Sequence, residues 1–541
     1  MDNIEQLESR LWESADQLRA NSKLTSTEYC MPVLGLIFLR HAYNRYLIVK
    51  ADIEKNLPKR GGVTRSLTQD DFARKSSLYL QEISQYDYLL ENEEAKQDRG
   101  KAIIKAMEAI ESDYESLKGV LPKDFQIFDN ELLGRLLKIF NDEALRNTNG
   151  DVFGRIYEYF LMKFAMQGAQ DQGEFFTPVS LVQTIVNTIE PDHGIVFDPA
   201  CGSGGMFVQT SHFLENAGKP THEAVTFFGQ EKTATTIRLA KMNLAVHGLE
   251  GKILEGNTFY EDNHNLLSKA DFVMANPPFN VDGVDARKIK GDPRLPFDLP
   301  GVNQKGAVGN GNYLWISYFY AYLNAKGRAG FVMSSQASSA GHGEKDVRRK
   351  IIETGDVDIM ISIRSNFFYT RAVPCELWFF DKSKPKHKKD KVLMLDARNI
   401  FRKVTRKVYD FSPEQLKNIT SIIWLYRGQT EKFISLVNEY FRKVSSECAL
   451  LPDKFNAFEK SYQLLWKQFF QIKTADEGKA KALKDIKNEL SEAWALFDKD
   501  KTDTVALMDT YQKRWGKDFP ETNDKQHKAK DVFAPIAEKI K

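Results

Sequence analysis

The sequence of 541 residues has few of the features that mark secreted, membrane-spanning or metal-binding proteins. Its four cysteines are scattered without a C-x-x-C pair, which argues against a disulfide framework and gives no reason to expect a metal site. No apolar run approaches the roughly 20 residues that cross a bilayer. The acidic first residues lead into an amphipathic helix over 4–18, unlike a signal peptide. We therefore expect a protein of the reducing cytoplasm that has no membrane contact.

The chain also has little net charge. Its 76 Lys and Arg residues and 74 Asp and Glu residues leave a formal charge of +2. A protein that holds nucleic acid by its overall field carries a clear positive excess. If this chain acts on DNA, local basic patches or a partner protein must supply much of the DNA-binding affinity. A solvated hairpin loop explains the basic run 382–391 better than a phosphate-contacting patch does.

Hydrophobic periodicity divides the chain into three regions. Residues 1–155 carry amphipathic helical stretches and predict a helical domain for partner or DNA contact. Residues 156–410 alternate short β-rich runs with helices, which predicts an α/β fold with a mainly parallel sheet. Residues 411–541 return to helical spacing and are rich in Lys, Asp, Glu and Ala in 474–512.

The central region contains eight short runs that predict strands of one twisted sheet. They are Ile195–Phe197, Thr226–Gly229, Lys252–Leu254, Asp271–Ala275, Ala329–Met333, Val357–Ile363, Glu376–Phe380 and Lys391–Leu395. The Gly/Pro-rich stretch 291–312 is predicted to be a loop. A loop that closes on substrate and an inert surface excursion fit it equally well.

A glycine-rich turn follows the first of these strands. Asp198 is followed by Pro-Ala-Cys and then by Gly202, Ser203, Gly204 and Gly205, at the start of a helical run. Glycines let a ligand approach the backbone, although a purely structural turn would look the same. A carboxylate here repels phosphate and suits a cation such as the sulfonium or aminium of S-adenosylmethionine. The turn predicts a nucleoside pocket.

Two further strand ends add to this pocket. Glu231 ends the second strand, where an acid in doubly wound folds accepts both ribose hydroxyls. A surface Glu that caps the next helix is the alternative. Asn257 follows the third strand and could meet the adenine of the cofactor. Because parallel strands end at the same edge of a sheet, we expect these residues to converge.

The fourth strand ends in Asn276, Pro277, Pro278 and Phe279. Neither proline can donate to a sheet ladder, so this turn is poor structural material. An amide oxygen and a backbone carbonyl can accept both hydrogens of one exocyclic amine, and a phenyl ring can stack on the base that carries it. The turn predicts a catalytic site that holds a planar amine, with Asn276, Pro277 and Phe279 as its catalytic residues.

These motifs resemble those of the amino-methyltransferases that modify adenine in DNA. GEFFTP at 173–178, DPACGSGG at 198–205 and NPPF at 276–279 follow the order of the gamma class. Residues 312–336 and the N-terminal segment LESRLWESADQLRANSKLTSTEYCMPVLGLIFLRH resemble the modification subunit of Type I restriction-modification systems. The resemblance implies a Rossmann-like class I methyltransferase domain over 156–410, between helical N-terminal and C-terminal regions.

The resemblance also implies roles and partners. It assigns S-adenosylmethionine contacts to the glycine turn, to Glu231 and to a segment before the first strand, which comprises Glu174, Phe175, Phe176, Thr177, Pro178 and Val179. Thr177 suits the cofactor carboxylate, and Phe367, Phe368 or Tyr369 could face Phe279 across a flipped base. The implied partners are double-stranded DNA, a specificity subunit that contacts 411–541, a second copy of the chain in the same complex, and in some systems a restriction or translocase subunit.

Three other functions remain open on sequence grounds. One is a stand-alone DNA adenine methyltransferase with built-in target recognition, and another is a non-catalytic scaffold that retains the fold. The third is methylation of protein glutamine or ribosomal RNA, although the helical flanks and GEFFTP favour DNA. The near-neutral charge and the helical tail favour a subunit whose target sequence is read by a separate protein.

Overall fold

The computed structural model divides the chain into two units, residues 1–418 and 419–541. The residues that it describes are 2–56, 59–60, 63–64, 66–73, 75, 77–146, 150–168, 176–368, 372–406, 408–515, 524, 528, 531 and 534. Within these ranges, no helix is long and apolar enough to span a bilayer.

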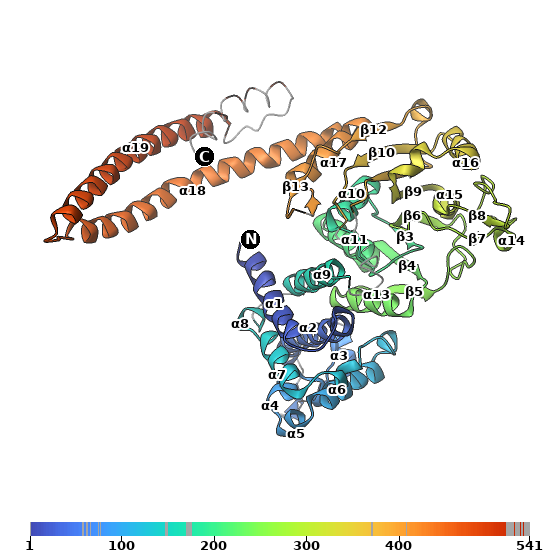
Figure 1. The fold of residues 1–541 in the computed structure, drawn as a ribbon, viewed down its shortest axis with the longest axis horizontal. Coiled ribbons are helices and arrows are strands. Elements are labelled where there is room, and N and C mark those ends of the chain that lie inside the picture. Colours follow the sequence, from blue (N-terminus) through green and yellow to red (C-terminus); the bar gives the residue numbers. More distant parts are fainter. Residues whose placement is uncertain are drawn as a thin grey trace. The chain divides into compact units, whose positions relative to one another are not determined.

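Helices form the first part of unit one, as the periodicity predicts (Figure 1). Every residue from Tyr29 to Asn44 of α2 is buried, so this helix is enclosed on all sides. Helix α9 passes through position 155, where the sequence pattern begins to change. The helices are α1 (Asp2–Ala20), α2 (Ser26–Asn56), α3 (Gln69–Ala73), α4 (Tyr86–Glu91), α5 (Glu93–Gln97), α6 (Arg99–Asp113), α7 (Asn130–Ile139), α8 (Glu143–Arg146) and α9 (Gly150–Met166).

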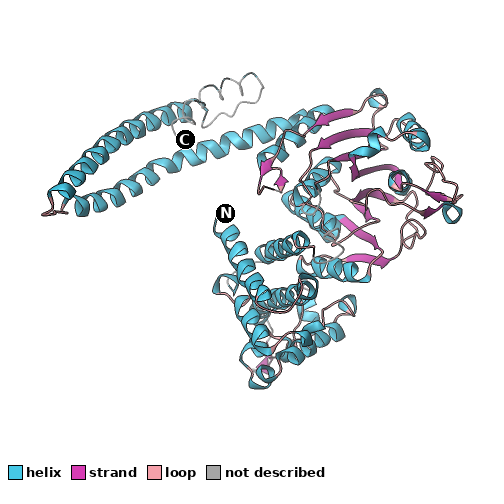
Figure 2. Ribbon diagram, viewed as in Figure 1, coloured by secondary structure: helices cyan, strands magenta, loops and turns pink. Residues whose placement is uncertain are grey.

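An eight-stranded sheet forms the second part of this unit and contains all eight predicted strands (Figure 2). The strand order is β12-β10-β11-β9-β6-β3-β4-β5. Strand β11 runs antiparallel to both of its neighbours, and the other strands run parallel to one another. The strands are β3 (Gly194–Asp198), β4 (Val225–Glu231), β5 (Gly251–Glu255), β6 (Ala270–Ala275), β9 (Leu323–Ser334), β10 (Val357–Ile363), β11 (Cys375–Asp381) and β12 (Leu393–Asp396).

Helices cover both faces of the sheet. Gly330 of β9 faces α10, where a Cβ would lie 2.9 Å from Ile185 and 3.0 Å from Ile189. Its neighbours Ala329 and Phe331 are in the core that contains α15. Successive strand residues point to opposite faces, so α10 and α15 lie on opposite sides. The helices are α10 (Val179–Ile189), α11 (Gly205–Asn216), α12 (Thr221–Ala224), α13 (Ala234–Val246), α14 (Ala286–Ile289), α15 (Asn312–Tyr322) and α16 (His342–Glu353).

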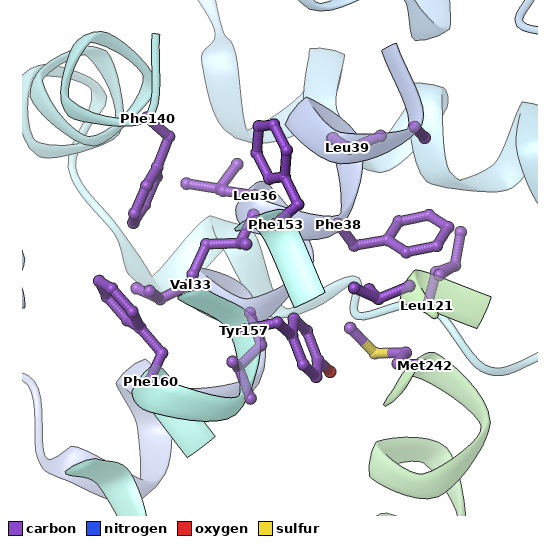
Figure 3. Close-up of a cluster of buried hydrophobic side chains, with 14 of the residues drawn as sticks. Val33, Leu36, Phe38, Leu39, Leu121, Phe140, Phe153, Tyr157, Phe160 and Met242 are labelled. Carbon is purple, nitrogen blue, oxygen red and sulfur yellow. The ribbon is translucent and has the colours of Figure 1, made fainter. Parts of the chain in front are cut away.

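Helix α13 joins the sheet region to the N-terminal helices through one hydrophobic core. Its residues Met242 and Val246 are buried in the same cluster as side chains of α2 and α9 (Figure 3). Arg238 of α13 donates to the carbonyl oxygens of Val120 and Leu121, at 3.1 and 3.2 Å. The N-terminal helices therefore fix α13 from the side opposite the sheet.

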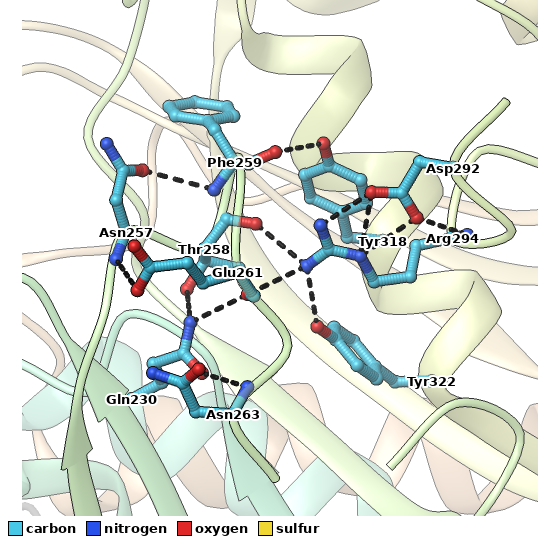
Figure 4. A network of polar contacts seen from close by, with 10 residues as sticks. All are labelled: Gln230, Asn257, Thr258, Phe259, Glu261, Asn263, Asp292, Arg294, Tyr318 and Tyr322. Atoms are coloured by element: carbon cyan, nitrogen blue, oxygen red, sulfur yellow. Dashed lines mark hydrogen bonds and ion pairs between the residues drawn. The ribbon is translucent and has the colours of Figure 1, made fainter. Parts of the chain in front are cut away.

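The segment between β6 and α15, which includes the stretch 291–312, is held by a buried arginine (Figure 4). Arg294 forms a bidentate ion pair with Asp292, at 2.6 to 3.1 Å. It also donates to the carbonyl oxygens of Thr258 and Glu261, at 2.8 and 3.0 Å. One guanidinium thus ties this segment to the loop that follows β5.

The same guanidinium is fixed against α15. It donates to the Tyr322 hydroxyl at 3.1 Å and lies 4.6 Å from the ring centroid of Tyr318. The segment also contributes the buried side chains of Ile289, Phe297 and Val308 to the core, and its short strands β7 (Val284–Asp285) and β8 (Ala307–Val308) pair. This packing is more extensive than an inert surface excursion would have.

The basic run 382–391 connects β11 to β12, but the predicted hairpin is wrong. Strand β12 pairs in parallel with β10, so the two strands that the run joins are not neighbours. Lys384 is buried and donates to the carbonyl oxygen of Val357 at 2.6 Å. Lys389 forms an ion pair with Asp356. The run is therefore partly a buried connection as well as a solvated loop.

The second unit contains a helical hairpin. Helix α17 (Pro413–Arg427) crosses the division between the units, and α18 (Thr430–Phe470) and α19 (Glu477–Trp515) follow. Tyr462 stacks on Trp494 with ring centroids 4.0 Å apart, and Phe458 contacts Phe497 at 5.1 Å. Moving along α18 from Phe458 to Tyr462, the contacted residue moves back along α19 from Phe497 to Trp494. The two helices are therefore antiparallel.

The shared core predicts that a truncation in α13 destabilises unit one. Met242 is fully buried, so Met242→Ala should lower the free energy of unfolding by about 2–5 kcal/mol. Met394, which is 64% exposed on β12, supplies a matched control, and Met394→Ala should have little effect. Urea unfolding followed by circular dichroism measures both. Equal unfolding midpoints for the two variants would contradict a core shared across α13.

The arginine network predicts a second contrast within one segment. Arg294→Ala leaves Asp292 without its cation in a largely buried place and should cost about 3–5 kcal/mol of unfolding free energy. Arg287 makes a similar bidentate pair with Asp285, but its side chain is 82% exposed. Arg287→Ala should leave the unfolding midpoint nearly unchanged. A loss of similar size in both variants would show that burial of Arg294 is not what matters.

Candidate active site at the carboxyl ends of the strands

The turn between β3 and α11 has the geometry of a ligand cradle. Gly202 and Gly204 have φ angles of 51° and 77°, a backbone conformation that residues with a Cβ rarely adopt. A Cβ built on Gly205, the first residue of α11, would meet no atom within 4 Å among the described residues beyond its own helix and chain neighbours. The turn therefore presents bare backbone at a helix N-terminus beside open space.

Asp198 and Glu231 meet at this turn, as the order of the strands predicts. Asp198 is buried and accepts a hydrogen bond from the backbone N–H of Ala200 at 3.0 Å. Burial raises the pKa of its carboxyl well above the ordinary value, and the charge of Glu231 raises this pKa further. Glu231 accepts a hydrogen bond from the Gly202 N–H at 3.2 Å. Two acids from neighbouring strands thus face one glycine turn.

Helix α13 supports the turn from beneath. Asn243 is buried and donates to the carbonyl oxygen of Ser203 at 2.9 Å. No sequence pattern signals this bond, because Asn243 is one polar residue on an otherwise ordinary helix. Cys201 is also buried, and burial raises the pKa of its thiol well above the ordinary value. It packs in the turn as expected and is unsuited to act as a thiolate nucleophile.

Asn257 lies at the end of β5, but its side-chain oxygen is already partly used. This oxygen accepts a hydrogen bond from the backbone N–H of Phe259 at 3.1 Å, which closes the local turn. The Asn257 N–H donates to the Glu261 carboxylate at 3.2 Å. A contact with a cofactor base could come from the Nδ2 atom of Asn257 or from the second lone pair of its Oδ1 atom.

Asn276 has an unpartnered polar atom, as does Asn243 beneath the glycine turn, whose Oδ1 atom is also buried without a partner among the described residues. The Nδ2 atom of Asn276 donates to the hydroxyl oxygen of Thr177 at 3.1 Å. Its Oδ1 atom is buried and has no hydrogen-bond partner in the part of the chain that the structure describes. A buried carbonyl oxygen without a donor costs about 1–3 kcal/mol and needs an explanation.

An aromatic pair stands beside Asn276. Phe279 and Phe368 contact edge to face, with ring centroids 5.9 Å apart and planes at 83°. Phe367 is buried in the core, where it packs on Phe411 at 4.8 Å. Of the three aromatic candidates, Phe368 therefore lies next to the Asn-Pro-Pro-Phe turn, and Tyr369 is outside the described residues.

The residues of the segment before α10 have different surroundings. Phe176 is buried in the N-terminal core, Pro178 caps α10, and Val179 is the first residue of that helix. Thr177 reaches Asn276, a contact between side chains 99 positions apart that the sequence does not predict. Glu174 and Phe175 lie outside the described residues.

Comparison with known families gives matches to most of the chain. Residues 148–447 match the N-6 DNA Methylase family, and residues 7–140 match the HsdM N-terminal domain. The resemblance inferred from the GEFFTP, DPACGSGG and NPPF motifs is therefore confirmed.

Two curated relatives have the same designation. The methylase subunit of the Type I restriction enzyme MjaIX from Methanocaldococcus jannaschii is 35% identical over 461 residues, which cover 82% of this chain and 81% of that protein. The methylase subunit of HindI from Haemophilus influenzae is 33% identical over 338 residues, which cover 60% and 74%.

Solved structures share the fold. The methyltransferase subunit of a Type I restriction-modification system from Streptococcus thermophilus gives a TM-score of 0.63 at 20% identity, over 78% of this chain and 93% of that one. A modification subunit of a putative Type I restriction enzyme from Vibrio vulnificus gives 0.51 at 18% identity, over 78% and 90%. With a family match over more than half of its length and a 35% identical relative along four fifths of both chains, this chain belongs to the N-6 DNA methylase family, among the methylase subunits of Type I restriction enzymes.

Proposed function

We propose that this chain is the modification subunit of a Type I restriction-modification complex and transfers a methyl group from S-adenosylmethionine to the N6 atom of a flipped adenine in DNA. The observation that carries the proposal is the buried, unpartnered Oδ1 atom of Asn276 at the end of β6. A buried oxygen that lacks a donor within the protein is suited to accept a hydrogen bond from an amine of the substrate.

The residues around the glycine turn fit the proposed cofactor. S-adenosylmethionine, when bound, supplies an electrophilic methyl group on a positively charged sulfur. The carboxyl of Asp198 suits such a cation, and the turn of Gly202 to Gly205 admits a ligand close to the backbone. Glu231 would accept the ribose hydroxyls with the lone pairs that remain after its bonds to the Gly202, Lys232 and Thr233 N–H groups. Asn257 would contact the adenine ring through its side-chain amide.

Thr177 can serve the cofactor and Asn276 together. A hydroxyl has one donor and two acceptor positions, and Thr177 uses an acceptor position for the Asn276 amide. Its own hydrogen makes no bond to the described residues and would serve the cofactor carboxylate. Thr177 would then couple cofactor binding to the position of the Asn276 amide, which holds the target amine.

The Asn-Pro-Pro-Phe turn, residues 276–279, orients the amine. The Oδ1 atom of Asn276 and the carbonyl oxygen of Pro277 accept the two amine hydrogens, which turns the nitrogen lone pair away from the base ring. Direct transfer then needs no covalent enzyme intermediate. The target base must leave the DNA stack, which costs a few kcal/mol. Stacking on Phe279, with Phe368 nearby, recovers about 1–3 kcal/mol.

The net charge of the chain and the exposed apolar side chains of unit two support the proposed partners. A net charge of +2 is small for a protein that would hold DNA alone. The hairpin of unit two leaves Leu464 and Leu465 about two thirds exposed, which suits a protein contact. We assign residues 411–541 to a specificity subunit, residues 1–155 to partner or DNA contact, and residues 156–410 to catalysis. A complex in which two copies of this chain share a specificity subunit, with a restriction subunit added for cleavage, follows by analogy.

The proposed function is tested by methyl transfer from labelled S-adenosylmethionine to DNA, followed by mapping of the modified base. The chain purified together with the specificity protein encoded beside it should form N6-methyladenine at defined sites. The chain alone should form little, because it does not select a sequence. Asn276→Ala should abolish transfer in the complex and leave cofactor binding intact.

Asn303→Ala is the matched control for that experiment. Asn303 caps an exposed turn by accepting from the Lys305 and Ala307 N–H groups, and its variant should methylate normally. Site-specific transfer by the chain alone would favour a self-sufficient enzyme. Absence of methylation in the complex would reject catalysis and leave a scaffold.

Asp198 predicts a pH dependence of cofactor affinity. Its pKa is raised in the folded protein, so its contribution to the stability of the cofactor-free protein is present below the ordinary value of 3.8 and is lost as the pH rises through the folded pKa. A bound cation favours the ionised carboxylate, so affinity for S-adenosylmethionine should increase with pH over the same window. Calorimetric titrations from about pH 5 to about pH 8 measure this change.

Asp198→Asn should bind the cofactor more weakly and remove most of the pH dependence. Asp346→Asn, on the exposed face of α16, should behave like the wild-type protein. Equal pH dependence in Asp198→Asn and wild type would show that another group titrates.

A further inference from the structure

Asn280, the residue directly after the Asn-Pro-Pro-Phe turn, is held in an unusual conformation. Its φ angle is 55°, in the left-handed region that residues with a Cβ seldom occupy. Asn280 is exposed, so packing of its own side chain does not impose this conformation. Such backbone strain persists only where the surroundings over-determine it.

Asn312, the first residue of α15, determines the conformation of Asn280. Its Oδ1 atom accepts the backbone N–H of Asn280 at 2.9 Å, and its Nδ2 atom donates to the Asn280 side-chain oxygen at 2.9 Å. One amide thus holds both the backbone and the side chain of the same residue. Asn312 is 1% exposed, and ten of the eleven residues of α15 are buried. The anchor therefore belongs to the rigid core.

Neighbours of Asn312 complete the attachment. Asn310 donates to the Asn280 side-chain oxygen at 3.2 Å and accepts the Asn312 N–H at 2.9 Å. The Gly311 N–H donates to the carbonyl oxygen of Val281 at 2.8 Å. The residues that enter α15 are therefore bonded to two successive residues after the catalytic turn.

The catalytic turn needs this outside support because it has few donors of its own. Pro277 and Pro278 have no N–H group, so the turn cannot close through their backbone. Thr177 holds Asn276 at the entrance, at 3.1 Å. Asn312 holds Asn280 at the exit, at 2.9 Å. Between these two attachments lie the Pro277 carbonyl and the Phe279 ring, the groups that would meet the base.

We propose that Asn312 is a positioning residue for methyl transfer, which fixes the Asn-Pro-Pro-Phe turn in its amine-accepting geometry by holding Asn280 in the left-handed conformation. The inference rests on the proposed function. Asn312 touches neither substrate nor cofactor in this role and acts through Asn280. Its loss should lower kcat and leave cofactor affinity unchanged, because Asp198, Gly202 and Glu231 belong to other strand ends.

Variants of the exposed residue Asn280 test the inference without disturbing the core. Asn280→Gly adopts a positive φ freely and keeps the N–H that Asn312 accepts, so its kcat should stay within about threefold of wild type. Asn280→Ala keeps the same N–H but disfavours the left-handed conformation, so its kcat should fall about tenfold. Both variants remove the oxygen that accepts the Nδ2 bond of Asn312, so both should lower the unfolding midpoint to a similar extent and bind S-adenosylmethionine with wild-type affinity.

Asn312→Ala removes the anchor itself and should lower kcat by about tenfold or more, with the dissociation constant for S-adenosylmethionine within about twofold of wild type. Asn303→Ala is the matched control from the same segment. All variants are assayed as the full chain, in whichever preparation supports methylation by the wild type. Kinetics, cofactor titration and unfolding are measured on the same samples.

The outcomes separate the inference from the function on which it rests. Equal kcat values for Asn280→Ala and Asn280→Gly would overturn the inference, and so would wild-type kcat in Asn312→Ala. Parallel losses of cofactor affinity, stability and kcat in Asn312→Ala would assign a general structural role instead. Absence of methylation by the wild-type protein in every preparation would overturn the proposed function and the inference with it.

Discussion

Two adjacent prolines at the end of β6 impose the constraint on which the site depends. Pro277 and Pro278 leave the chain without backbone donors where it turns away from the sheet, so its geometry must come from side chains elsewhere. Thr177 supplies one attachment, before α10, and Asn312 supplies the other, at the start of α15. Since α10 and α15 lie on opposite faces of the sheet, the turn is held from both layers.

The glycine turn is supported in a different way. Asn243 holds the Ser203 carbonyl from α13, and α13 is packed into the core of the N-terminal helices through Met242. The helical region is therefore part of the support of the glycine turn as well as a candidate surface for partners. A small shift of α2 or α9 would be transmitted to this turn through rigid, close-packed side chains.

The sequence predicts the sheet well and the contacts between its loops poorly. All eight strands appear as short apolar runs, and the convergence of Asp198 and Glu231 follows from the common edge of parallel strands. The hairpin over 382–391 was wrong because sequence order does not reveal that β12 pairs with β10. The contacts of Arg294 and Asn312 cannot be predicted from the sequence. Each joins one polar residue to a partner more than 30 positions away, and local hydrophobic periodicity carries no information about such pairs.

The chemistry of the turn also limits what this chain can select. In the proposed role, Asn276 and Pro277 offer neutral acceptors that any planar amine with two hydrogens can satisfy. Adenine differs here from other amino bases only in the shape that Phe279 and Phe368 admit, and neither group reads the neighbouring base pairs. Base pairs are distinguished by donor and acceptor patterns in the grooves, which a site built for one extruded base does not reach. A methylase of this design therefore needs sequence recognition from a separate surface, and the near-zero net charge of the chain favours a surface on another protein.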